Sequence, residues 1–176
     1  MLATPCKFTL VAGHGEGGTP LNAFDAALVE AGIGNLNLLR VSSILPPSTQ
    51  LTRNLEIPPG SLTPTAYGFI TSSQPGQVIA AAIGVGIGSP DSIGVIMEFE
   101  GYCAKDEADA SVRKMVEEGF ERRGLTLQEV HVLGIDHQVK AVGSVVAAAV
   151  LWYGSGSLEL GVRGSKEKAD RSSNRR

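Results

Sequence analysis

The sequence predicts an α+β domain built in layers, and the spacing and order of its apolar segments support this prediction. Two segments carry apolar residues at helical spacing, and several others have the length and apolar content of strands. Their order is strand, helix, strand, then further strands, a second helix and final strands, with no internal repeat. With 176 residues, of which 43% are hydrophobic and 19% charged, the chain fits one globular domain that needs no disulfide or metal to fold.

The first predicted strand and helix are separated by glycines. A strand over residues 7–12 ends at the glycine-rich GHGEGG of residues 13–18, which we interpret as a turn. Thr19 is suited to cap the following helix, and Pro20 to occupy its first position. Apolar side chains recur along one stripe of this helix until Gly32, a residue that commonly terminates helices.

The remaining elements follow a pair of serines. A strand over residues 35–41 leads to Ser42 and ends before Pro46 and Pro47, after which the chain is rich in turn residues. The later elements are predicted to be strands at 65–72, 77–87, 92–99, 126–140 and 144–152, and a helix at 105–123 closed by Gly124.

Local signals also predict two hairpins and a tail. Pro75 and Gly76 indicate a tight turn, and therefore a hairpin between the strands at 65–72 and 77–87. The last two strands are expected to form another hairpin. Glycine, serine and charged residues dominate after Tyr153, which predicts a flexible tail over residues 154–176.

The composition limits the classes of partner. The net charge is −3, and the basic residues gather in the tail, so the acidic body favours a small cationic substrate over nucleic acid. Two cysteines, Cys6 and Cys103, without a CxxC pair favour a reducing cytoplasm over a disulfide framework. We expect no signal peptide and no membrane span. His131 and His137 are too far apart along a strand to bind one metal, and His14 lies alone in the predicted turn, so no metal is expected.

The Ser42–Ser43 pair is the feature of the sequence that most strongly suggests a chemical reaction. A serine pair at a strand end, before a proline break, is a place where backbone strain can be held. The hydroxyl of Ser43 can attack the carbonyl of Ser42 and convert the amide into an ester. Elimination then releases the upstream chain, and loss of ammonia leaves a pyruvoyl group. Because Ser-Ser is a common dipeptide, the pattern alone does not favour this chemistry over an ordinary polar turn.

Longer stretches resemble one family. GIGNLNLLRVSSILPP around the serine pair, EGGTPLNAFDAAL upstream, and PTAYGFI, GVIMEFEG and AAAVLWY downstream are similar to the pyruvoyl-dependent arginine decarboxylases. The similarity runs in one register over residues 9–153. It implies self-cleavage between Ser42 and Ser43 into residues 1–42 and 43–176, with a pyruvoyl cofactor formed from Ser43.

The resemblance also implies a fold, an assembly and a reaction. The family's fold is a layered αββα sandwich, with mostly antiparallel sheets and two main helices outside. Its members form trimers with active sites between neighbouring subunits. They convert L-arginine to agmatine, a polyamine precursor, and carbon dioxide, through a Schiff base to the pyruvoyl group.

Glu98 is the candidate proton donor for the substrate carbon that loses carbon dioxide. Strand alternation places Glu98 on one face with Ile96 and Glu100. A carboxyl beside apolar neighbours tends to keep its proton, which suits an acid. The resemblance implies the same residue. By pattern alone a solvated strand face is the alternative, and Glu100 is the nearest rival.

Two further residues have candidate roles. The Asn37 amide could donate to the oxyanion formed during the acyl shift, and the resemblance implies Asn37 rather than Asn35 for this role in processing. Asp25 is suited to bind a guanidinium bidentately, and the resemblance implies that contact too. A turn asparagine and a solvated aspartate are the alternatives. Two other functions stay open at this point: the same chemistry on another amino acid, and a non-catalytic trimeric paralogue that never matures.

Overall fold

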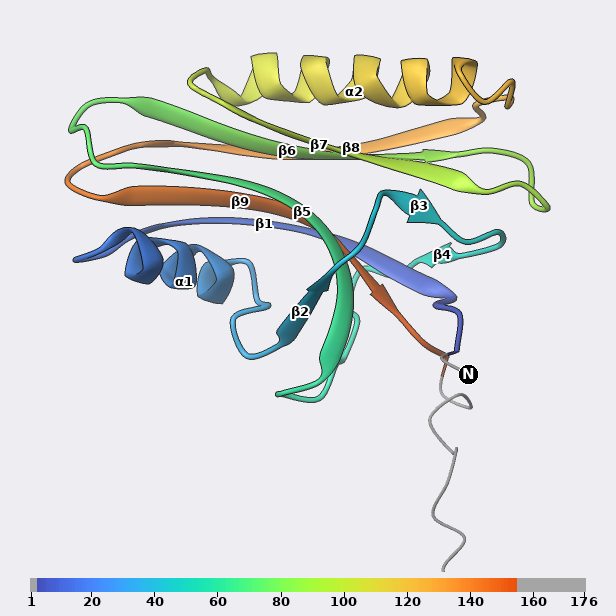
Figure 1. The fold of residues 1–176 in the computed structure, drawn as a ribbon, viewed down its shortest axis with the longest axis horizontal. Coiled ribbons are helices and arrows are strands. Elements are labelled where there is room, and N and C mark those ends of the chain that lie inside the picture. Colours follow the sequence, from blue (N-terminus) through green and yellow to red (C-terminus); the bar gives the residue numbers. More distant parts are fainter. Residues whose placement is uncertain (1–2, 155–176) are drawn as a thin grey trace, which may run out of the picture.

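The computed structural model, which describes residues 3–154, consists of two β-sheets packed face to face with one helix on each outer face (Figure 1). The helices are α1 (Pro20–Glu30) and α2 (Lys105–Glu121). The strands are β1 (Lys7–Glu16), β2 (Asn37–Arg40), β3 (Ile44–Leu45), β4 (Gln50–Leu51), β5 (Leu62–Ser72), β6 (Val78–Ile87), β7 (Gly94–Gly101), β8 (Glu129–Gln138) and β9 (Gly143–Trp152). The α+β sandwich predicted from the sequence is confirmed.

The sheets are mostly antiparallel. One has five strands in the order β2-β5-β9-β1-β4, and the other has four in the order β3-β7-β6-β8. The parallel pairs are β1 with β4 and β2 with β5. Helix α1 covers the outer face of the five-stranded sheet, and α2 covers the outer face of the four-stranded sheet. The short strands β2 and β3 lie on the same edge of the sandwich in different sheets, which becomes important at the candidate site.

The core lies between the sheets, and smaller clusters lie beneath each helix. All ten residues of β9 are buried because this strand is central in its sheet and is covered on both faces. The central cluster includes the large side chains of Phe8, Ile79, Ile83 and Ile96, each fully buried. A side chain that points inward from either sheet therefore enters an apolar, water-poor environment.

Both hairpin predictions are wrong. Strands β5 and β6 belong to different sheets, and so do β8 and β9. The turn at Gly76 exists, with a positive φ of 86°, but it carries the chain across the sandwich. The two crossovers pair with each other, because Gly76 N–H donates to the Val139 carbonyl (2.7 Å) and Val139 N–H to the Gln77 carbonyl (2.9 Å). A local turn signal does not distinguish a return within one sheet from a step between two sheets.

The glycine-rich segment is a strand rather than a turn. Strand β1 continues into it as far as Glu16, and Gly13 and Gly15 of the strand, with Gly17 just after it, face α1. A Cβ added at any of the three would lie within 2.6 Å of α1 or residues adjoining it. The alternation therefore brings the helix backbone close to the strand.

The same correction changes the position of His14. This residue lies in β1 rather than in a loop, and its ring stacks on His137 of β8 with centroids 4.7 Å apart. Each imidazole is paired with a carboxylate: His14 with Glu30 (Nε2 to Oε1, 3.4 Å) and His137 with Glu16 (Nε2 to Oε1, 2.7 Å).

The predicted helices are confirmed at their starts. The Thr19 hydroxyl accepts a hydrogen bond from Asn22 N–H (3.2 Å), and Pro20 occupies the first turn of α1. Helix α2 has no cap from its own N-cap residue, but Asp136 of β8 accepts from Lys105 N–H (2.8 Å). The predicted tail lies outside the described residues, apart from Gly154.

Candidate active site

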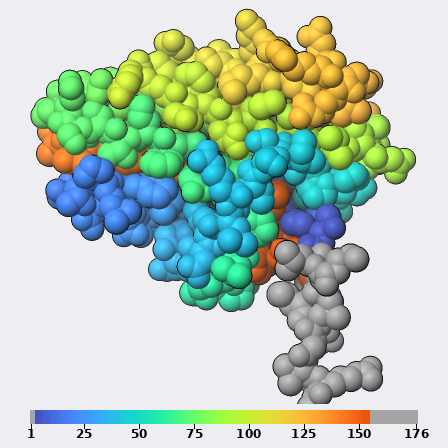
Figure 2. All heavy atoms as spheres, viewed as in Figure 1, coloured from blue at the N-terminus to red at the C-terminus, as the bar shows by residue number. Residues whose placement is uncertain are grey.

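The chain changes sheets at the serine pair. On the upstream side, β2 pairs with β5, and Val41 N–H still donates to the Thr65 carbonyl (3.2 Å) in the five-stranded sheet. On the downstream side, β3 pairs with β7, and Ile96 N–H donates to the Ser43 carbonyl (2.8 Å) in the four-stranded sheet. Ser42 is therefore the link between the layers. Figure 1 shows the chain rising from β2 to β3, and Figure 2 shows this cyan segment on the molecular surface.

Ser43 has a left-handed backbone conformation, with φ 48°. This conformation costs a residue with a Cβ roughly 1–2 kcal/mol relative to the right-handed region. The pairing of the chain on both sides holds the residue there, since upstream and downstream segments belong to separate sheets. Strain is thus stored beside the Ser42–Ser43 bond, where an acyl shift could release it.

The hydroxyl of Ser43 is directed at Glu98. Ser43 Oγ donates to the carboxylate of Glu98, at 3.1 Å from Oε1 and 3.2 Å from Oε2. Glu98 lies on β7 and is half-buried, and its burial raises the pKa of the carboxyl. The structure thus brings together the two residues that sequence reasoning assigned to cofactor formation and proton donation.

Other side chains around Glu98 act on its protonation. The Ser43 hydroxyl and the charge of Arg40 oppose the rise in the pKa of Glu98, whereas the charge of Glu100 adds to it. Arg40 is held over the ring of Tyr67, with its guanidinium carbon 4.9 Å from the ring centroid.

A glycine gives the two carboxylates their space. Gly68 of β5 lies opposite them, and a Cβ at this position would be 2.8 Å from Glu100 Oε2 and 3.2 Å from Glu98 Cβ. The absence of a side chain at Gly68 therefore lets the two sheets approach at this edge without displacing either carboxylate.

Asn37 and Asp25 lie away from this pair. Asn37 begins β2, and its side-chain Nδ2 donates to the Gly60 carbonyl (2.7 Å), at the far end of the strand from Ser42. Asp25 is exposed on α1. Within residues 3–154, no hydrogen bond joins either residue to Ser43 or Glu98.

Comparison with known proteins identifies the family of this chain. Residues 7–155 match the family model of the pyruvoyl-dependent arginine decarboxylases. The chain is 51% identical over 150 residues to the pyruvoyl-dependent arginine decarboxylase of Methanocaldococcus jannaschii, which covers 85% of this chain and 91% of the relative. It is 46% identical over 152 residues to that of Pyrococcus abyssi, with 85% and 96% covered. The chain belongs to the pyruvoyl-dependent arginine decarboxylase family.

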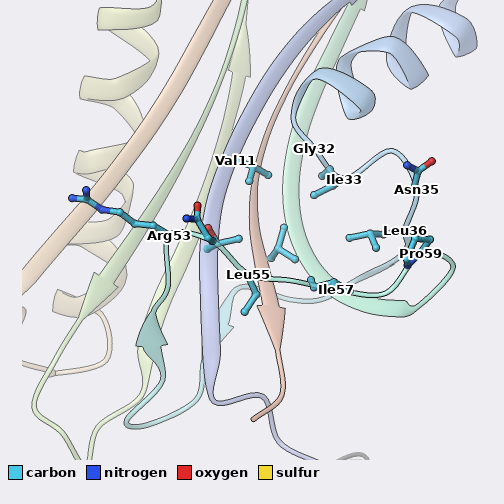
Figure 3. A pocket seen from close by; sticks show the side chains of 12 residues that line it. Val11, Gly32, Ile33, Asn35, Leu36, Arg53, Leu55, Ile57 and Pro59 are labelled. Atoms are coloured by element: carbon cyan, nitrogen blue, oxygen red, sulfur yellow. The ribbon is translucent and has the colours of Figure 1, made fainter. Parts of the chain in front are cut away.

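In this member of the decarboxylase family, Ser43 and Glu98 line none of the four cavities described within residues 3–154. A cavity of about 310 Å³ lies on the outer face of the five-stranded sheet, below the end of α1 (Figure 3). Its centre is apolar, with Val11, Ile33 and Leu55, while the Arg53 side chain points away from the other labelled residues. Neither Ser43 nor Glu98 lines it, so we do not assign the chemistry to this cavity.

Over residues 3–154, no cluster of three or more histidine, cysteine or acidic side chains is arranged to hold a metal ion. In the same part of the chain, no helix is long and apolar enough to cross a membrane.

Sequence reasoning missed two members of the site. Gly68 stands in the PTAYGFI stretch, and a glycine inside a strand is a signal of close backbone approach that could have identified it. The backbone N–H of Ile96 had no sequence signal, because its position depends on the pairing of β3 with β7.

Proposed function

We propose that this protein is a self-processing pyruvoyl-dependent decarboxylase that converts L-arginine to agmatine and carbon dioxide. The observation that carries the proposal is the arrangement at Ser43: a left-handed backbone at the link between two sheets, with the hydroxyl on Glu98. The names of the relatives support the cofactor and the substrate.

Cofactor formation uses the atoms of Ser43 itself. Its Oγ forms an ester with the Ser42 carbonyl carbon as the peptide C–N bond breaks, and the released nitrogen takes a proton. Loss of the Cα proton and cleavage of the Cβ–Oγ bond leave Ser42 as a carboxylate. Addition of one water and release of ammonia then leave a ketone at the former Cα. The products are residues 1–42 and residues 43–176, the latter beginning with the pyruvoyl group.

Glu98 acts in the decarboxylation that follows. The pyruvoyl group supplies an electron sink for the breaking carbon–carbon bond. Glu98 lies within hydrogen-bond distance of residue 43, and its pKa is raised by burial, so it can deliver a proton to the substrate Cα after carbon dioxide leaves.

Asp25 and Asn37 act across a subunit boundary in this proposal. Asp25 binds the guanidinium of the substrate, and Asn37 stabilises the oxyanion formed at Ser42 during the acyl shift. Among the described residues, neither is hydrogen-bonded to Ser43 of its own chain, and Asp25 is exposed. A trimer with active sites between neighbours would bring them to Ser43 of another copy, and closed symmetric assemblies are the general rule. We also propose a cytoplasmic location, which the two free cysteines support.

The intact mass of the purified protein tests self-cleavage. We expect one fragment ending at Ser42 and another with a pyruvoyl-blocked residue 43, and a single uncut chain from the Ser43→Ala variant. An uncut wild-type chain that releases no carbon dioxide from arginine would contradict the proposal and favour the non-catalytic paralogue.

A substrate survey tests the choice of arginine. We expect Asp25→Asn to lose activity on arginine by raising KM, with cleavage between Ser42 and Ser43 unaffected. Residual activity on amino acids without a cationic end should change little. Equal losses on every amino acid would remove Asp25 as the residue that selects arginine.

A further inference from the structure

Ser43 has three polar atoms, and they have different fates in the proposed maturation. The nitrogen is released as ammonia, and Oγ leaves with the new carboxylate of Ser42. The backbone carbonyl oxygen alone stays, as the amide oxygen of the pyruvoyl group. The hydrogen bond from Ile96 N–H to this oxygen (2.8 Å) is therefore the one contact, among those described for the polar atoms of Ser43, that maturation preserves.

This contact extends the pairing of β3 with β7. Ile44 lies opposite Val95, and Leu45 opposite Gly94, so Ser43 and Ile96 are the next pair in the same antiparallel register. Only one of the two bonds expected for such a pair is found in the described chain: Ile96 N–H donates, but Ser43 N–H does not bond Ile96. The left-handed backbone of Ser43, with φ 48°, explains this, because a pair with both hydrogen bonds needs extended backbone on both strands. The carbonyl oxygen that stays is therefore hydrogen-bonded to the backbone of β7, whereas the nitrogen that leaves is not.

The donor is rigid. The Ile96 side chain is fully buried in the core between the sheets, and on its other side β7 pairs with β6 along seven residues, Val85 lying opposite Ile96. A backbone N–H held in this way cannot reorient when the charge of its acceptor changes. Such fixed donors stabilise developing charge without a cost of reorganisation.

We propose, on the basis of the function proposed above, that the backbone N–H of Ile96 is a catalytic group, which holds the amide oxygen of the pyruvoyl group and stabilises the negative charge that decarboxylation places on it. When formed and joined to the substrate, the pyruvoyl group would supply an electron sink whose outermost acceptor is this oxygen. A hydrogen bond to it strengthens as the charge develops, which lowers the barrier.

The same strand also carries the proposed acid. Ile96 and Glu98 are two residues apart on β7, so their backbone positions differ by about 7 Å along one rigid strand. The strand would thus hold residue 43 by its carbonyl oxygen and present the carboxyl of Glu98 to the same residue. Electron acceptance and proton delivery are positioned by one element.

Amide-to-ester exchange tests the proposal without changing a side chain. The peptide N–H of Ile96 is replaced by oxygen through incorporation of the α-hydroxy analogue of isoleucine into the full chain. Val95 carries the matched control. It is also fully buried and β-branched, and by the alternation of an antiparallel ladder its N–H faces β6 rather than Ser43. Both variants lose one ladder hydrogen bond, but only the first removes the donor to residue 43.

We expect the Ile96 ester to mature but to lose about 10²–10³-fold in kcat, with little change in KM, the loss typical of removing one oxyanion donor. The Val95 ester should stay close to the wild type. With ¹³C in the serine carbonyl carbon, the infrared band of the cofactor amide should move to higher wavenumber in the Ile96 ester only.

Two results would overturn the inference. Equal kcat losses in both esters without a selective band shift would reduce Ile96 to an ordinary ladder residue. A block in cleavage confined to the Ile96 ester would place the N–H in maturation rather than in decarboxylation. Either result is separable from failure of the proposed function, which would already be apparent as an uncut or inactive wild-type chain.

Discussion

The carboxyl of Glu98 is subject to opposing influences on its proton. Burial raises its pKa, the Ser43 hydroxyl and Arg40 lower it, and Glu100 raises it, with a net rise. Maturation removes the Ser43 hydroxyl, so the largest of the influences that lower the pKa of Glu98 is lost. If protonated Glu98 is the acid, kcat falls as pH rises through this raised pKa. We therefore expect a basic limb in the kcat–pH profile, measured by carbon dioxide release at saturating arginine.

Two amide variants test which carboxyl group produces the basic limb of the kcat–pH profile. Glu98→Gln can still accept from the Ser43 hydroxyl, so it should mature, but without a proton to give it should lose about 10²–10⁴-fold in kcat. Glu100→Gln should keep most of the activity, and its basic limb should move to lower pH because a group that raises the pKa of Glu98 is removed. If the losses were reversed between the two variants, Glu100 would be the acid.

At the residue scale, the sequence predicted identities better than conformations. Ser43 and Glu98 were assigned from motif resemblance and strand alternation, and they lie within hydrogen-bond distance. The left-handed backbone of Ser43 could not be predicted, because it results from pairing with two different sheets on either side. Asp25 is exposed on α1, and its apolar neighbours Leu21 and Val29 are exposed as well, so the apolar spacing of this helix did not indicate which of its residues are buried.

At the scale of elements, the approach of α1 to β1 depends on glycines. A Cβ at Gly15 would lie 2.5 Å from Ala26 Cβ and 2.7 Å from the backbone nitrogen of Ala27. The Gly15→Ala variant must therefore displace the helix. We expect a loss of about 1–3 kcal/mol in stability, as for other overpacked sites. The KM for arginine should also rise, because α1 carries Asp25. Thermal unfolding and steady-state kinetics measure the two effects.

Gly18→Ala is the matched control for this prediction. It belongs to the same glycine run, but no atom lies within 4 Å of the added Cβ. Its stability should stay within about 0.5 kcal/mol of the wild type. Equal stability of the two alanine variants would show that the packing of α1 against β1 does not depend on the glycines.

The element-scale errors of the sequence analysis have one cause. The glycine run and the Pro75–Gly76 pair were interpreted as local turns of one sheet, but three glycines of the run contact α1 and the turn at Gly76 joins two sheets. In β1 they accommodate a helix, and at Gly76 the turn carries the chain between sheets. Periodicity identified the strands and helices well because burial of one face is recorded in the sequence, whereas the choice of partner strand depends on the whole fold.

At the scale of the whole molecule, Glu16 ties the two sheets together at the crossover between β8 and β9. Burial alone would raise its pKa, but hydrogen bonds from Lys140 N–H, His137 and Ala141 N–H outweigh this and lower it to about 2, from an ordinary 4.5. Val142 N–H also donates to the carboxylate (3.1 Å). The carboxylate of one sheet thus fixes the chain segment that leaves the other.

The sign of the resulting pH dependence follows from the lowered pKa. The charged form is preferred by the folded state, so Glu16 contributes stability above about pH 4.5, and the contribution disappears as pH falls toward about 2. In the Ser43→Ala background, which keeps the chain in one piece, Glu16→Gln should cost about 2 kcal/mol at neutral pH. That loss corresponds to a fall in Tm of roughly 4–8 °C. The gap should narrow as both proteins are acidified from pH 5 to pH 3, because the unfolded wild type takes up a proton on this carboxyl below about pH 4.5, which reduces the advantage of the charged folded form.

Glu129→Gln is the control variant for the contribution of the Glu16 carboxylate to stability. Glu129 also pairs with a histidine, at 3.2 Å from His131 Nε2, but its side chain is 61% exposed, against 27% for Glu16. An exposed pair contributes little, so this variant should stay within about 0.5 kcal/mol of its parent at every pH. A Tm gap for Glu16→Gln that stays constant from pH 7 to pH 3 would show that the carboxylate charge is not what joins the sheets. A narrowing gap would show that ionised Glu16 stabilises the fold and that acid weakens this contribution. Glu16 lies at the end of β1 opposite the residues that pair with β4.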